Sequence, residues 1–228
     1  MNHILTPRSV LFNPARITAI VPAYNEEGNI AEVLRVLKKS LELSDIIVVD
    51  DGSTDRTAEV AQQEGVRVIR QKNQGKAGAM ATGAAHTDAD ILFFADADLV
   101  GLTPGHVTAL VEPVIAGGVG MTVGIRDRGV LATWMMENVL PVIGGERALP
   151  RDIFLQIVQH HSSKRFGIET IMNAYCKKKR IPVRLVRMEG LTHIIKEVRY
   201  GFWRGIIARM RMVREIFIAE MATLFDRI

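Results

Sequence analysis

Four acidic residues lie just behind apolar segments of the sequence: Glu26, Asp51, Asp96 and Asp98. Asp96 and Asp98 closely follow the segment 91–94 and are separated by one residue. Mg²⁺ and Mn²⁺ typically take one or two carboxylates and complete their shells with substrate phosphates and water. An isolated Asp-x-Asp more often caps a turn or a helix, but three acidic loops together favour a site for a hard divalent cation.

These acidic residues need strands and helices that bring them together. Short apolar segments alternate along the chain with segments whose apolar residues recur at helical spacing. We expect strands at 17–23, 46–49, 66–69, 91–94 and 119–125, and helices that begin near residues 30, 54, 76 and 103. Apolar strands that alternate with helices are typical of a parallel sheet covered on both faces. The predicted fold class is α/β, with ligands bound at the loops that follow the strands.

The regular alternation ends near residue 126. A glycine-rich segment follows at 144–148, and we expect helices at 150–160, 166–179 and 200–228 and a strand at 181–187. No linker or internal repeat calls for a second domain. We therefore expect one domain over 1–228, divided into 1–126, 127–199 and a basic amphipathic helix at 200–228.

Composition and charge exclude several classes of protein. The chain has 228 residues, 48% of them hydrophobic and 24% charged, as in a globular protein with a core. Residues 177–228 hold 13 of the 29 Lys and Arg residues but 5 of the 25 Asp and Glu residues. This uneven charge argues against a uniformly basic nucleic-acid binder. It favours a local basic patch that meets phosphate groups or an anionic surface.

Other sequence features concern the compartment and the nucleotide-binding class. A single cysteine and the absence of a signal-type apolar segment lead us to expect a cytoplasmic protein. We expect no transmembrane segment, because no uncharged stretch approaches the roughly 20 residues that a spanning helix needs. The loops after the strands also lack the glycine-rich turns of Rossmann dehydrogenases and P-loop NTPases.

Four linked motifs resemble those of the family 2 nucleotide-sugar glycosyltransferases, which have the GT-A fold, a Rossmann-like sheet flanked by helices. The motifs are VPAYNEE from Val21, VVDDGSTD from Val48, NQGKAGA from Asn73 and DAD from Asp96, in the family's order and spacing. The match is close from residue 17 to about 125 and looser beyond. Within the family, the chain is similar to enzymes of the dolichol-phosphate mannosyltransferase and glucosyl-3-phosphoglycerate synthase types.

The resemblance implies that the first part, 1–126, binds a nucleotide sugar. It places Pro22, Ala23, Tyr24 and Glu26 around the nucleoside, Asp51 on the base, and Gly75 and Lys76 along the nucleotide. It also implies that Asp96 faces the ribose and the metal, and that Asp98 acts in catalysis by ligating Mg²⁺ or Mn²⁺, which neutralises the departing diphosphate. For Lys76, a solvated lysine at a helix start is an alternative interpretation.

For the second part, 127–199, the resemblance implies acceptor and metal contacts. Gly145 and Arg147 lie in the segment that resembles the family's acceptor loop, and Arg147 is a candidate contact for an acceptor phosphate. Glu169 is the candidate base or acceptor-orienting carboxylate, and His193 is the candidate third metal ligand. The alternatives are surface residues for Arg147 and His193 and a glutamate that stabilises a helix start for Glu169.

The predicted function is transfer of a hexose from a UDP- or GDP-sugar to a phosphate-bearing acceptor. Polyprenyl phosphate comes first, because a basic helix at 200–228 with aromatic residues can lie on an anionic membrane. That helix can equally pack on its own domain or on a second copy in a homodimer. A small phosphorylated acid such as 3-phosphoglycerate is the alternative acceptor.

Two further function classes stay open: a sugar nucleotidyltransferase and a non-catalytic nucleotide-sugar sensor. We expect the protein in the cytoplasm, at most peripheral on the inner face of the membrane, and not on nucleic acid. Both inverting and retaining stereochemistry stay open, because family 2 is typically inverting whereas the His193 resemblance points to retaining relatives.

Overall fold

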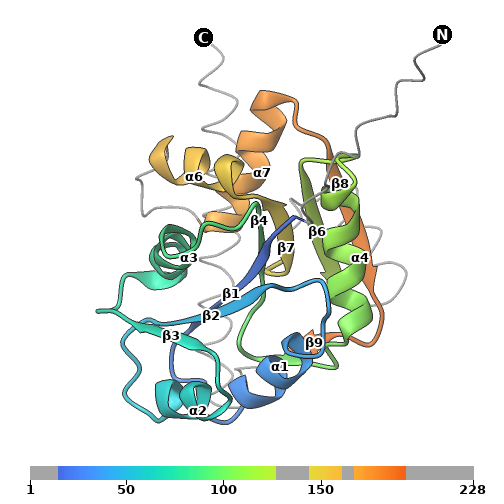
Figure 1. Cartoon of the computed structure of the whole chain (residues 1–228). Coiled ribbons are helices and arrows are strands. Elements are labelled where there is room, and N and C mark those ends of the chain that lie inside the picture. Colours follow the sequence, from blue (N-terminus) through green and yellow to red (C-terminus); the bar gives the residue numbers. More distant parts are fainter. Residues whose placement is uncertain (1–14, 127–143, 161–166, 194–228) are drawn as a thin grey trace, which may run out of the picture.

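The computed structural model describes residues 15–126, 144–160 and 167–193 (Figure 1). Its strands are β1 (Ile17–Ala23), β2 (Asp45–Asp50), β3 (Arg67–Arg70), β4 (Ile91–Phe94), β5 (Leu99–Val100), β6 (Met121–Arg126), β7 (Arg147–Pro150), β8 (Val183–Met188) and β9 (Thr192–His193). Its helices are α1 (Ile30–Leu37), α2 (Thr57–Gln63), α3 (Gly75–Ala85), α4 (Pro104–Ile115), α6 (Arg151–His160) and α7 (Ile168–Lys179). Within these residues, no helix is both long and apolar enough to cross a bilayer.

Seven strands form one mixed sheet in the order β3-β2-β1-β4-β7-β6-β8. The first four are parallel, as are β6 and β8, whereas β7 runs antiparallel to both β4 and β6. The α/β class and the alternation of strands and helices are thereby confirmed. The sheet joins strands of 1–126 to strands of 127–199, and the subdivision into three parts stays a prediction.

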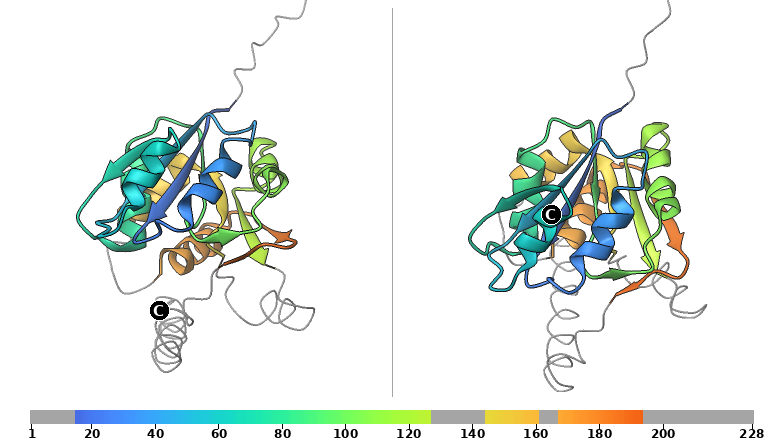
Figure 2. Two further views of the ribbon diagram at one scale, coloured as in Figure 1. Left: turned by 90° about the horizontal axis from the view of Figure 1, so that it is seen from below. Right: turned by 60° about the horizontal axis from the view of Figure 1, so that its bottom comes forward.

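Helices cover both faces of the sheet, as Figure 2 shows. On one face, the apolar residues of α1, α2 and α4 pack against alternate residues of β1, among them Ile17, Ala19 and Val21. On the other face, α3, α6 and α7 pack against Ile20 and against Phe94, whose ring lies 4.7 Å from that of Phe154 between centroids. Burial on both faces explains why the central strands are apolar throughout.

The carboxyl ends of β1, β2 and β4 meet at one edge of the sheet, at the bottom of Figure 1. In register, Ala23 of β1 lies beside Asp50 of β2, and Ile20 lies beside Phe94 of β4. The loops that carry Glu26, Asp51 and Asp96 consequently start from neighbouring strands, as the sequence predicted.

Three elements differ from the sequence-based expectation. Residues 147–150 form strand β7 instead of continuing the expected loop, and two-residue strands β5 and β9 form a small separate sheet. Strand β7 has the sequence RALP, which is not an apolar run like that of β4, and two-residue strands are too short to show a period. The expected helix at 200–228 lies outside the described residues.

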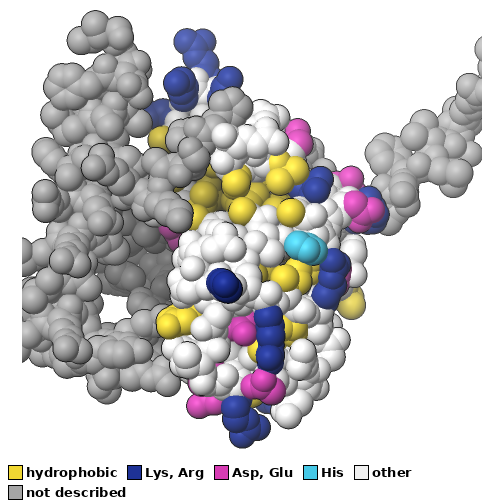
Figure 3. Space-filling view, turned by 90° about the vertical axis from the view of Figure 1, so that its left-hand side faces the viewer, with side chains coloured by type: hydrophobic (Ala, Val, Ile, Leu, Met, Phe, Trp, Pro, Cys, Tyr) yellow, Lys and Arg dark blue, Asp and Glu magenta, His cyan; other side chains and the backbone are white. Residues whose placement is uncertain are grey.

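The outer face of α2 and β3 carries charges of both signs. Ion pairs join Arg67 of β3 to Asp45 and Arg70 of β3 to Glu59 of α2. In Figure 3, basic and acidic side chains lie interspersed over the lower part of the face that is turned to the viewer. This part of the surface presents no field of a single sign.

Helix α3 approaches the sheet closely because Gly83 has no side chain. A Cβ atom at this position would lie 2.5 Å from Cγ2 of Ile20. That methyl group is fully buried in the central strand β1 and has little room to move.

We therefore expect Gly83→Ala to lower the free energy of unfolding, measured by urea denaturation, by about 1–3 kcal/mol, the usual cost of overpacking. Helix propensity alone predicts the opposite sign, a gain of about 1 kcal/mol. The control Ala77→Gly, at an exposed position of α3, measures the propensity term in the same helix. A Gly83→Ala protein more stable than wild type would contradict this packing.

Candidate functional site

A pocket of about 240 Å³ lies at the carboxyl edge of the sheet, where the loops after β1, β2 and β4 meet. It is lined by Pro22, Ala23, Tyr24, Glu26, Asp51, Lys76, Ala79, Asp96, Ala97 and Asp98. Apart from the two small residues Ala79 and Ala97, each is a residue that the sequence predicted for the donor or the metal. Residues from four segments that are far apart in the sequence thus meet in one cavity.

A larger open depression, of about 640 Å³, lies at the opposite edge of the sheet. Its arginines already have partners: Arg16 pairs with Asp88 at 2.8 Å, and Nε of Arg151 donates to the Ala84 carbonyl at 3.0 Å. In α/β sheets, ligands bind beyond the carboxyl ends of the strands. The smaller pocket is therefore the candidate site.

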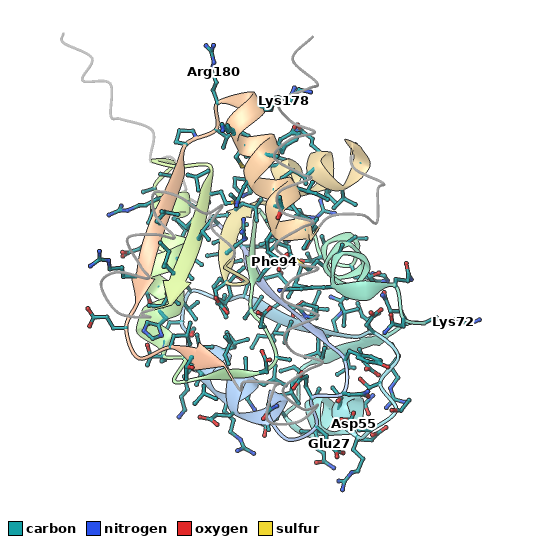
Figure 4. All side chains as sticks on the ribbon, turned by 180° about the vertical axis from the view of Figure 1, so that it is seen from behind. Glu27, Asp55, Lys72, Phe94, Lys178 and Arg180 are labelled. Carbon is teal, nitrogen blue, oxygen red and sulfur yellow. The ribbon has the colours of Figure 1, made fainter. Side chains whose placement is uncertain are left out.

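The loop after β1 is held against the loop after β2 by a set of backbone and side-chain hydrogen bonds. The Asn25 amide donates to Ser53 Oγ at 2.9 Å, and the Glu26 amide donates to Thr57 Oγ1 at 2.8 Å. Asn25 has a positive φ of 56°, which asparagine tolerates better than most residues. Next to this junction, Glu27 and Asp55 lie side by side in Figure 4. Glu26 is consequently buried at a fixed place in the pocket wall.

Asp51 holds the start of helix α3. Its Oδ1 accepts from Gln71 Nε2 at 2.7 Å and from the Gln74 amide at 2.8 Å, and its Oδ2 accepts from the Gly75 amide at 2.8 Å. A carboxylate offers about four lone-pair positions, so these three bonds leave Oδ2 with room for one more donor. A contact between Asp51 and a base would use that position. The sequence did not indicate the capping role.

The Lys76 ammonium bridges two carboxylates. Its Nζ lies 2.6 Å from Asp96 Oδ1 and 2.7 Å from Glu169 Oε1. Burial alone would lower the pKa of Lys76, but the charges of Asp96 and Glu169 outweigh it and raise that pKa. Burial would likewise raise the pKa of Glu169, yet the neighbouring ammonium lowers it. Lys76 is therefore not the solvated lysine that the sequence left as an alternative.

The acceptor-loop glycine lies directly against the first aspartate of the DAD motif. A Cβ atom on Gly145 would be 2.3 Å from Asp96 Oδ2. The Asp96 carboxylate is thus held between Lys76 on one side and the Gly145 backbone on the other. The sequence predicted both Gly145 and Asp96, and the structure brings them together.

Asp96 and Asp98 suit a divalent cation that also binds phosphate. Both carboxylates line the pocket, and a cation, the Lys76 ammonium, already lies against Asp96. Two carboxylates are a normal protein share for Mg²⁺ when phosphates and water supply the other ligands. In residues 15–126, 144–160 and 167–193, no three His, Cys, Asp or Glu side chains form a metal-binding group.

The predicted third metal ligand, His193, lies in β9. This strand pairs antiparallel with β5, and His193 is opposite Leu99, the residue after Asp98. The backbone therefore places His193 beside the DAD motif. Its side chain lies outside the described part, so its role as a ligand stays a prediction.

Arg147 requires a correction, because its side chain is fully buried. Its Nε donates to the Gly144 carbonyl at 2.7 Å, and its Nη1 donates to Asn173 Oδ1 at 2.7 Å. Burial lowers the pKa of Arg147 to about 10, against the opposing effect of acidic groups that include Glu169. The guanidinium ties the acceptor loop to α7 and has no exposed surface that a phosphate could contact.

The basic cluster at the end of α7 lies away from the site. Glu169 is in the first turn of this helix, whereas Lys177, Lys178 and Lys179 are in its last turn. Figure 4 shows Lys178 and Arg180 at the opposite end of the molecule from Glu27 and Asp55. These residues thus lie apart from the pocket, and the expectation that the basic part meets phosphate groups or an anionic surface stays a prediction. The basic residues beyond 193 lie outside the described structure.

The contact between Gly145 and Asp96 yields a direct test. We expect Gly145→Ala to displace the Asp96 carboxylate and to weaken divalent-cation binding, measured by calorimetry with Mn²⁺ and UDP, by roughly 10–100-fold, as for other perturbed metal ligands. The control is Gly105→Ala, because a Cβ there would meet nothing nearer than Thr103 Oγ1 at 3.8 Å. Equal affinities in the two variants would show that this close contact does not position Asp96.

Comparison with known proteins agrees with this arrangement. An uncharacterized protein of Methanocaldococcus jannaschii is 42% identical over 118 residues, which cover 50% of this chain and 48% of that protein. The 4,4'-diaponeurosporenoate glycosyltransferase of Staphylococcus aureus is 35% identical over 116 residues, which cover 48% of this chain and 31% of that enzyme. The chain thus spans less than half the length of these two curated relatives.

The fold matches that of glucosyl-3-phosphoglycerate synthase from Mycobacterium tuberculosis, solved with Mn²⁺, UDP and glucosyl-3-phosphoglycerate. The TM-score is 0.70 at 22% identity, over 92% of this chain and 80% of that one. The sheet and its flanking helices are those of a GT-A domain. The family model for glycosyl transferase family 2 matches residues 18–151, which contain the pocket and the DAD motif. This chain therefore belongs to glycosyl transferase family 2.

Proposed function

We propose that this chain transfers a hexose from a UDP- or GDP-sugar to a phosphate-bearing acceptor, with a Mg²⁺ or Mn²⁺ ion held by Asp96 and Asp98. The observation that carries the proposal is the meeting of the nucleoside, phosphate and metal candidates in one pocket at the carboxyl edge. The M. tuberculosis synthase, crystallised with UDP-glucose, Mn²⁺ and phosphoglyceric acid, supports this class of donor and acceptor.

In the donor part of the pocket, each wall offers a suitable group. Tyr24 lines the pocket and is half exposed, and its aromatic ring is of a kind on which a base can stack. The remaining lone pair of Asp51 Oδ2 can accept an N–H from a base edge. Asp96 and Asp98 lie where the diphosphate would follow. A bound divalent ion would neutralise the leaving diphosphate.

Glu169 is better suited to orient the acceptor than to deprotonate it. The Lys76 ammonium lowers the pKa of this carboxyl group, which makes it a weaker base. A phosphate oxygen is already ionised near neutral pH and needs no base to become a nucleophile. The Glu169–Lys76 pair therefore supports an acceptor whose phosphate oxygen is the nucleophile, such as polyprenyl phosphate. An acceptor such as 3-phosphoglycerate that reacts through a hydroxyl group still needs a base.

Two acceptors fit this proposal. Polyprenyl phosphate is our first candidate, in line with the basic segment 200–228, whose contact with a membrane or with a second copy stays a prediction. A small phosphorylated acid is the second candidate, favoured by the phosphoglyceric acid bound to the M. tuberculosis synthase. With either acceptor we expect the protein in the cytoplasm. Only with polyprenyl phosphate do we expect it to associate peripherally with the membrane.

The donor part of the proposal can be tested by calorimetry with UDP, GDP, UDP-glucose and GDP-mannose, each with Mn²⁺, Mg²⁺ or EDTA. We expect either the uridine compounds or the guanosine compounds to bind, and to bind only in the presence of metal. Asp98→Asn should weaken that binding by roughly 10–100-fold, the usual effect of damage to a metal site. The control is Glu59→Gln, a change at an exposed acidic residue of α2. Absence of metal-dependent binding of every nucleotide would contradict the proposal.

The acceptor is then identified in a transfer assay. The assay uses the donor that binds, with a radiolabel in its sugar. Label in the organic phase with a polyprenyl phosphate indicates the first acceptor, and label in an anionic water-soluble product with 3-phosphoglycerate indicates the second. Release of pyrophosphate from UTP or GTP and a sugar phosphate would instead indicate a nucleotidyltransferase. Donor binding without transfer to either acceptor would favour the sensor.

A further inference from the structure

The Lys76 bridge links the two halves of the site. Lys76 lies in the first turn of α3, Asp96 follows β4, and Glu169 lies in the first turn of α7. The side chains of Asp96 and Glu169 are 23% and 14% exposed, so both carboxylates are largely withdrawn from water. One ammonium is thus shared between a carboxylate of the donor side and a carboxylate of the acceptor side.

The geometry places the ammonium where a divalent cation would compete with it. Lys76 Nζ lies 2.6 Å from Asp96 Oδ1, while Asp96 Oδ2 faces the Gly145 backbone. The close packing at Gly145 leaves the carboxylate little freedom to turn away. A divalent ion and an ammonium at the same oxygen repel each other, and the repulsion is strong where water is scarce.

We propose that Lys76 is a competing cation that keeps the divalent metal weakly bound until a nucleotide diphosphate arrives and offers the ammonium another anionic partner. This inference rests on the proposed function, because it assigns a regulatory role to the same site. Metal and nucleotide then both favour the state in which Lys76 has left Asp96. Each ligand therefore raises the affinity of the protein for the other. The metal would bind together with the donor. Movement of Lys76 would also alter its ion pair with Glu169.

The test measures Mn²⁺ affinity by electron paramagnetic resonance, without and with saturating UDP, in wild type, Lys76→Met and Lys76→Arg. Without UDP, we expect Lys76→Met to bind Mn²⁺ on the order of tenfold more tightly than wild type. The factor by which UDP tightens Mn²⁺ binding should fall in Lys76→Met by a similar amount. Lys76→Arg keeps the positive charge beside Asp96 and should therefore bind Mn²⁺ more weakly than Lys76→Met without UDP.

Lys72→Met is the matched control, because it removes one positive charge four residues earlier in the chain. Lys72 is exposed, and Figure 4 shows it pointing away from the body of the protein. Its Mn²⁺ affinity and its UDP coupling should equal those of wild type. Thermal unfolding verifies that each variant is folded, and Lys76→Gln replaces Lys76→Met if the latter does not fold.

The outcomes separate this inference from the proposed function. If UDP and Mn²⁺ bind to wild type but Lys76→Met leaves both the Mn²⁺ affinity and the coupling unchanged, Lys76 is not a competing cation. An equal gain in Lys72→Met would attribute the effect to net charge and would also overturn the inference. If no nucleotide binds to wild type, the proposed function fails, while the measurement with Mn²⁺ alone still tests the competition.

Discussion

Parallel hydrogen bonding of β1 to β2 and to β4 is the constraint on which the site depends. Because the three strands run in the same direction, their carboxyl ends share one edge and their loops converge. A reversed central strand would send the loop with Glu26 to the other edge. The apolar, doubly buried character of these strands is therefore a condition for the chemistry as much as for the core.

Convergence of acidic loops creates an electrostatic problem. Asp96 and Glu169 are largely buried near each other, and buried charges of the same sign are costly unless a counter-ion joins them. Lys76 supplies that counter-ion at 2.6 and 2.7 Å. Deeper in the protein, the buried Arg147 connects the acceptor loop to α7 through Gly144 and Asn173. Lys76 thus holds the acceptor half against the donor half, whereas Arg147 holds two segments of the acceptor half together.

Much of the donor half could be predicted from the sequence, because apolar runs mark its strands and short motifs mark the loops that follow them. Apolar runs predicted β1, β2 and β4, and the motif loops behind them supplied most of the pocket lining. The antiparallel β7 could not be predicted, since its four residues begin with an arginine, end with a proline and form no apolar run. The roles of individual charged residues could not be predicted either, because the sequence does not show whether a charged side chain is buried. Arg147 and Lys76 could both be interpreted as surface residues until the structure placed one in the core and the other between two carboxylates.

The most direct test of this account is a crystal structure of the protein with Mn²⁺ and UDP. The account predicts the nucleotide in the pocket between Tyr24 and Asp51, the metal between the diphosphate and the carboxylates of Asp96 and Asp98, and Lys76 Nζ moved from Asp96 toward the diphosphate. A nucleotide bound outside this pocket, or a metal bound away from both aspartates, would contradict it.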